Sequence, residues 1–286
     1  MAASAPSSDK EASLWEHIEE LIIRLRKIII AFIVSAAVFS LIPAGDSGAL
    51  YVPLITRLPV LIFSHTVPSQ IEALDGKVYN VTVMPSSMFE SVQIMMQAVL
   101  LLGTIGSAPI AAREIWAYIE PALYPHEKAF AKKFIVLFVV SFLFGVVFAI
   151  YIVAPLIITM MLKMYPFFVP PEYGFILPVS ISDTVGFVLK LAIAFGLLFE
   201  LPVLLYLLLA YGIVDPEMFG KDTMKYILLG SMILGAIISP DPSGLGMLLI
   251  GFSLYLPMHI AITLGKKRGL ERRALEEAKA VARYGS

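Results

Sequence analysis

The chain has 286 residues, of which 59% are hydrophobic and only 15% are charged, and its formal net charge is −1. Soluble domains carry about 25% charged residues, so this composition predicts a membrane protein whose solvent is largely the lipid bilayer. The near-zero charge gives no basic field for nucleic acid, and the lack of cysteine excludes disulfides, thiol catalysis and thiolate metal sites.

Residues 1–13 are polar, and we expect a disordered cytoplasmic tail rather than a cleavable secretory signal. Apolar side chains then recur at helical spacing over residues 14–25, which predicts an amphipathic helix at the membrane surface. Its polar face carries His17, Glu20 and Arg24 as candidate binding residues. Glu20 and Arg24 are one turn apart and can form an ion pair, although a solvated surface pair explains them equally well.

Charge-poor runs predict an all-α membrane fold with six transmembrane helices. Most of the 21 Lys and Arg residues flank the first run, lie in the second and fourth connections, or follow the last run. Since basic residues favour the cytoplasmic side, both termini are predicted to be cytoplasmic in a cell membrane. The six-span core covers residues 14–265, and 266–286 form a charged cytoplasmic tail. The predicted spans are 28–45, 91–112, 134–162, 185–214, 226–240 and 242–265.

The fifth span is short, because about 15 helical residues reach only about 22 Å, against a hydrocarbon core of about 30 Å. A re-entrant helix is the alternative, but five crossings would place the basic tail outside. We therefore retain six spans and infer local thinning of the bilayer. The helix-breaking turn 239–244, which contains Asp241, is predicted to face outward.

The outward connections, residues 43–90 and 165–183, are rich in proline and are predicted to be ordered caps. Asn80 begins an Asn-Val-Thr glycosylation pattern, which is a weak signal. Several spans also contain proline, which can bend a helix. The bent helices are therefore predicted to form a curved, concave wall.

One carboxylate, Glu200, lies near the middle of the apolar run 185–211. A charge at that depth costs roughly 3 kcal/mol or more, so an intramembrane acid commonly marks a pathway or a docking site. Pro202 lacks an N–H and leaves the carbonyl of Leu198 without its usual partner. We expect Glu200 to be mainly protonated at rest and to dock a partner helix. A carboxyl kept neutral for packing specificity is the alternative.

The connection after the second span carries aromatic residues that suit the membrane interface and carboxylates that suit a basic ligand. Tyr118, His126 and Glu127 are the candidate binding residues there, and an interfacial anchor is the alternative. The sequence contains no phosphate-binding loop, zinc helix or nucleophile elbow. Its four histidines fall in separate segments, so neither a metal site nor a cofactor is expected.

With these residues the chain resembles the TatC family, the multi-spanning subunit of the twin-arginine protein translocase. The resemblance covers about residues 14–265 and depends on the order and spacing of short motifs. These motifs are HIEEL at 17–21 followed by Arg24, SAP at 107–109, WAYIEPALYPHE at 116–127, FELPV at 199–203 and SPD at 239–241.

The resemblance implies a receptor, not an enzyme, that binds twin-arginine signal peptides of folded precursor proteins at Glu20 and Glu127. A carboxylate accepts an arginine guanidinium as a two-bond fork, which lysine cannot reproduce. The resemblance also implies that Glu200 faces the concave side and meets a polar residue of a TatA-like or TatB-like single-span partner. The family works as an oligomeric complex driven by the proton gradient.

A different class of protein also fits the intramembrane acid, namely a proton-coupled small-molecule permease in which Glu200 cycles its proton. Such permeases often contain repeated halves with broken helices in matching positions, and no convincing internal repeat is found in this sequence. A membrane-embedded enzyme would need clustered catalytic residues. Lys190 and Glu200 lie about 280° apart around one helix axis, so they do not form such a cluster.

Overall fold

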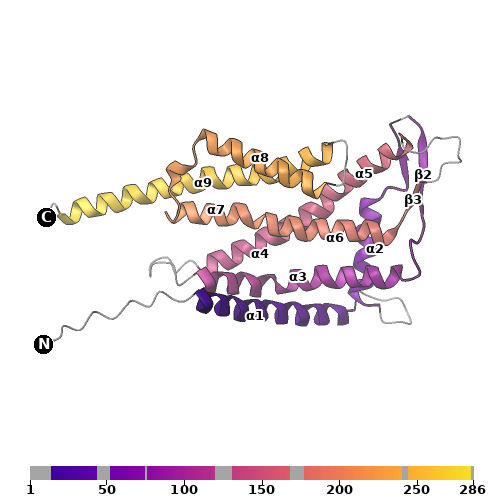
Figure 1. The fold of residues 1–286 in the computed structure, drawn as a ribbon, viewed down its shortest axis with the longest axis horizontal. Helices are drawn as coiled ribbons and strands as arrows, with labels where there is room; N and C mark the ends of the chain where they lie inside the picture. Colours follow the sequence, from indigo (N-terminus) through magenta and orange to yellow (C-terminus); the bar gives the residue numbers. More distant parts are fainter. Residues whose placement is uncertain are drawn as a thin grey trace.

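The structure is a computed structural model that describes residues 14–43, 52–74, 76–119, 131–167, 177–239 and 244–284. The described chain is mostly helical, and its long helices run side by side along the long axis of the molecule (Figure 1). The helices are α1 (Leu14–Leu41), α2 (Leu54–Thr66), α3 (Glu90–Ile119), α4 (Ala131–Phe148), α5 (Ala154–Met164), α6 (Ile181–Leu198), α7 (Glu200–Ala210), α8 (Lys221–Ile238) and α9 (Leu245–Tyr284).

Four helical columns of the described chain are long and apolar enough to cross a membrane, judged by length and composition: Glu90–Tyr118, Lys133–Met164, Ile181–Ala210 and Leu245–Ala274. They correspond to four of the six predicted spans. Helix α1 packs along α3 and α8 packs along α9 (Figure 1). Whether α1 and α8 also cross the bilayer, and on which side the termini lie, stay predictions.

The predicted surface helix and first span form one continuous helix, α1, rather than two. The physical reason is the absence of any proline or glycine between residues 14 and 41, so nothing in the sequence breaks the backbone hydrogen bonding. The amphipathic segment is therefore the first part of α1.

The all-α prediction is incomplete, because a small three-stranded sheet lies at the end of the molecule opposite the start of α1 and the end of α9 (Figure 1). Its strands are β1 (Gln70–Glu72), β2 (Val78–Val83) and β3 (Leu177–Val179). Strand β2 pairs antiparallel with β1 and parallel with β3. The sheet and α2 give order to the connection before α3 and tie it to the start of α6, as expected for an ordered cap.

Two glycines let α4 and α6 approach closely at the centre of the molecule. A Cβ added to Gly145 would lie 2.5 Å from the carbonyl oxygen of Phe195, and one added to Gly196 would lie 2.6 Å from the ring of Phe142. The side chains of Phe142 and Phe195 are both fully buried in the largest apolar cluster. Directly after α4, a π-helical turn, η3 (Ala149–Val153), joins α4 to α5. The close packing fixes the end of α6, directly before Glu200.

The two ends of the molecule give a direct test of its orientation. Ser69 lies beside the sheet, whereas Gly220 lies between α7 and α8, at the end of the molecule where α1 starts and α9 ends (Figure 1). Since the chain has no cysteine, a single introduced thiol is unique. We expect a membrane-impermeant maleimide added outside intact cells to label Ser69→Cys and to leave Gly220→Cys unlabelled. Labelling of position 220 from outside contradicts cytoplasmic termini.

Candidate functional site

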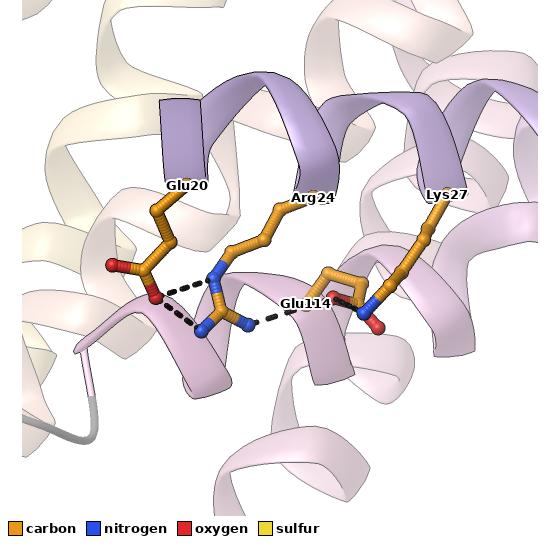
Figure 2. Close-up of polar contacts among 4 residues, drawn as sticks. All are labelled: Glu20, Arg24, Lys27 and Glu114. Carbon is orange, nitrogen blue, oxygen red and sulfur yellow. Dashed lines mark hydrogen bonds and ion pairs between the residues drawn. The ribbon is translucent and has the colours of Figure 1, made fainter. Parts of the chain in front are cut away.

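Helices α1 and α3 bring four charged side chains together at the end of the molecule where α1 starts (Figure 2). Nε of Arg24 donates to Oε1 of Glu20 over 3.1 Å, and a second guanidinium nitrogen donates to the same oxygen. A third nitrogen of Arg24 lies 3.5 Å from Oε2 of Glu114. Nζ of Lys27 donates to that oxygen over 3.2 Å. Arg24 therefore bridges a carboxylate of its own helix and one of α3.

Burial separates the roles of the two carboxylates. The side chain of Glu114 is only 8% exposed, whereas that of Glu20 is 37% exposed. A buried carboxylate is costly unless it is paired, and the two cations of α1 supply that pairing to Glu114. Both bonds from Arg24 to Glu20 end on Oε1, while the other carboxyl oxygen of Glu20 points away from Arg24 (Figure 2). Glu20 is thus the carboxylate that a further guanidinium can approach.

A hollow of about 310 Å³ runs along the same part of α1. It is bordered by three carboxylates, which lie about one turn or less apart, and by the two cations that pair with Glu114. Its lining therefore carries both signs of charge. This arrangement suits a charged, hydrogen-bonding ligand better than an apolar one. The hollow is lined by Glu16, Glu19, Glu20, Ile23, Arg24 and Lys27.

The other predicted binding residues have different outcomes. His17 lies in α1 one turn before Glu20, and Tyr118 is exposed near the end of α3. His126, Glu127 and Asp241 lie outside the residues that the structure describes. The structure therefore brings Glu20 and Arg24 together as the sequence predicts, and the signal-binding roles stay predictions.

Glu200 is the first residue of α7, after a turn at Phe199 that separates α7 from α6. The hydroxyl of Ser141 on α4 donates to the carbonyl of Phe199 over 2.7 Å, so the turn between α6 and α7 is tied to a neighbouring helix. Both carboxyl oxygens of Glu200 are buried and have no hydrogen-bond partner within the described chain. Lys190, ten residues earlier, is exposed on α6.

A family model described as "Sec-independent protein translocase protein (TatC)" matches residues 16–252 of this chain. The chain belongs to the TatC family. Members of this family are protein translocase components rather than enzymes, which agrees with the lack of a catalytic constellation in the sequence. In the described part of the chain, no group of three or more His, Asp and Glu residues is placed to hold a metal ion.

Relatives of this TatC-family chain match it over most of their length. The TatC protein of Aquifex aeolicus is 31% identical over 266 residues, which cover 93% of this chain and 99% of that protein. The TatC protein of Escherichia coli K12 is 28% identical over 245 residues, 84% of each. A crystal structure of the twin-arginine translocase receptor TatC superposes with a TM-score of 0.66 at 29% identity, covering 88% of this chain and 99% of that one.

The sequence analysis missed Glu114 as a site residue of this TatC-family chain. The available signal was an acid that follows Arg113 at the end of a long charge-poor run, because such an acid needs a cation when the helix packs. Which cation it meets depends on the pairing of α1 with α3, which sequence spacing does not reveal.

We expect burial, rather than distance, to decide the strength of these ion pairs. Replacing Glu114 with Ala should lower the free energy of unfolding by roughly 1–3 kcal/mol, because Arg24 and Lys27 lose a buried partner. The matched control is Asp222→Ala, whose carboxylate lies 2.8 Å from Lys225 but is 84% exposed. That change should cost about 0–1 kcal/mol. Melting temperatures in detergent would compare the two, and equal losses contradict the assignment.

Proposed function

We propose that this TatC-family protein is the receptor and core subunit of a twin-arginine translocase in the cell membrane, with both termini cytoplasmic. The observation that carries the proposal is the guanidinium already held by Glu20 through two donated bonds. A carboxylate in this position is placed to accept an arginine of a signal peptide in the same way. The packing of α1 and α8 along the four membrane-capable columns supports a six-span core.

The geometry favours arginine over lysine as the ligand. A guanidinium is planar and presents parallel N–H groups to one carboxylate, whereas a lysine ammonium acts as a point charge on a flexible stem. Two nitrogens of Arg24 donate to one carboxyl oxygen of Glu20, whereas Lys27 makes a single bond to Glu114. The second arginine of the signal is proposed to bind Glu127, in the segment that follows α3.

Binding requires Arg24 to share or leave Glu20, and Glu114 makes that exchange inexpensive. Arg24 already lies 3.5 Å from the buried carboxylate, so it keeps a partner when a peptide guanidinium takes Oε1 of Glu20. Without a bound peptide the cluster is neutral, because it contains two carboxylates and two cations. An incoming arginine adds one positive charge, which the neighbouring carboxylates Glu16 and Glu19 offset.

Glu200 is proposed to dock a TatA-like or TatB-like single-span helix in an oligomeric, proton-gradient-driven complex. Its two buried oxygens lack partners within the described chain, and leaving such a group unpaired costs about 1–3 kcal/mol. A polar side chain on a partner helix would remove this cost when Glu200 turns toward it. An unsatisfied group at a helix break is therefore a ready point for association inside the membrane.

Glu20→Gln should weaken binding of a peptide that carries a twin-arginine motif by about tenfold to a hundredfold, because one charge-assisted fork is worth roughly 1.5–3 kcal/mol. The control is Glu217→Gln, which changes an exposed carboxylate between α7 and α8, outside the hollow. Binding can be measured by fluorescence anisotropy, with a Lys-Lys peptide as the reference ligand. Unchanged affinity in Glu20→Gln would rule out this carboxylate as the receptor.

Glu200→Gln and Glu200→Ala separate docking from proton cycling. Gln keeps the shape and hydrogen bonding of a neutral carboxyl but cannot titrate, whereas Ala keeps neither. Docking predicts that Gln retains much of the precursor export and of the crosslinking to a single-span partner, and that Ala loses both. Equal and complete loss in the two variants would instead favour the permease class, in which Glu200 must carry a proton.

A further inference from the structure

A second and larger groove lies between α4, α7 and α9, away from the Glu20 cluster. Its volume is about 750 Å³, and its lining comes from the first half of α4, the end of α7 and one residue of α9. The walls are mainly apolar, whereas the two cations of the lining, Lys133 and Arg268, are exposed and therefore mark its mouth. The lining residues are Lys133, Val136, Leu137, Val140, Tyr206, Leu207, Ala210, Tyr211 and Arg268.

Close helix packing builds the α7 and α9 side of this groove. A Cβ added to Gly265 would lie 2.9 Å from Cβ of Leu209, and one added to Gly269 would lie 2.6 Å from the carbonyl oxygen of Leu209. The absence of both side chains lets α9 lie directly against α7. This contact places the guanidinium of Arg268 over the ring of Tyr206, with Cζ 5.9 Å from the ring centroid.

Arg268 differs from three other basic residues of α9, Lys266, Arg272 and Arg273, in what it binds. Lys266 donates to the carbonyl of Phe219 over 2.6 Å, Arg272 donates to the carbonyl of Tyr211 over 2.9 Å, and Arg273 lies 3.3 Å from a carboxyl oxygen of Asp215. These three hold the connection after α7. Arg268 contacts an aromatic face and, within the described chain, has no carboxylate at ion-pair distance, so its charge is directed to the groove.

We propose that this groove binds one anionic phospholipid. Its phosphate lies between Lys133 and Arg268, and an acyl chain follows the apolar wall of Val136, Val140 and Leu207. Basic pockets between transmembrane helices suit anionic headgroups, and tyrosines suit the level where headgroup and hydrocarbon meet. A lipid therefore matches both the charge at the mouth and the apolar character of the walls.

The charge of the groove argues against the other occupants. A twin-arginine peptide carries positive charge next to its apolar segment, and the cations at the mouth would repel it. A partner helix would cover the apolar walls without using either cation. The proposal is independent of the role of Glu20, because the two sites lie on different helices and favour ligands of opposite charge.

The test titrates the purified, detergent-solubilised protein with phosphatidylglycerol or phosphatidylcholine of identical acyl chains and follows bound lipid by native mass spectrometry. We expect one phosphatidylglycerol to bind at least about tenfold more tightly than phosphatidylcholine. The double change Lys133→Gln and Arg268→Gln should remove this preference. Lys225→Gln, an exposed cation paired with Asp222, is the matched control and should keep it. Equal affinity for both lipids in the parent, or an unchanged preference in the double variant, overturns the proposal.

Two further arms separate a lipid from other ligands. Val140→Trp fills the groove at a position that is 57% exposed, so the fold should persist while affinity for both lipids falls several-fold. Free glycerol 3-phosphate should not displace bound phosphatidylglycerol, and equal binding of the two would indicate a phosphate site rather than a lipid site. Displacement by a twin-arginine peptide would assign the groove to the peptide and reject the lipid. Melting temperatures of all variants show that each is folded.

Discussion

The buried carboxylate of Glu114 requires cations from another helix, and this requirement holds α1 and α3 together at the proposed receptor surface. Glu114 has little exposure, and its charge is balanced only when Arg24 and Lys27 of α1 lie against α3. This requirement fixes the position of α1, and with it the direction in which Arg24 reaches Glu20. The polar surface of α1 therefore depends on a residue of α3 that faces away from solvent.

The two acids Glu114 and Glu200 show how a carboxylate inside a membrane protein can serve different purposes. Glu114 is matched by two cations, which makes it a fixed part of the helix packing. Glu200 has no partner for either buried oxygen within the described chain, although the turn before it is anchored by Ser141. A rigid backbone beneath an unsatisfied side chain favours association with another molecule over internal stability.

Local features of this chain followed from its sequence, and features that depend on distant contacts did not. The pair of Glu20 and Arg24 follows from helical spacing, the four membrane-capable columns follow from hydropathy, and a disturbed helix near Glu200 follows from Pro202. The burial of Glu114 depends on which helices are neighbours. The pairing of β2 with β3 joins segments almost a hundred residues apart, and three-residue strands carry too little alternation to predict it.

The π-helical turn η3 lets a single helical column contact two sets of neighbours. One wider turn inserts an extra residue, so the side chains that follow it are rotated by about 100° relative to a continuous α-helix. Before the turn α4 packs on α6, whereas after it α5 packs on α2 and β1. Ala149 and Val153, at the two ends of the turn, are completely buried. Shortening this column by one residue would therefore uncouple the cap from the helix wall, although composition and length would hardly change.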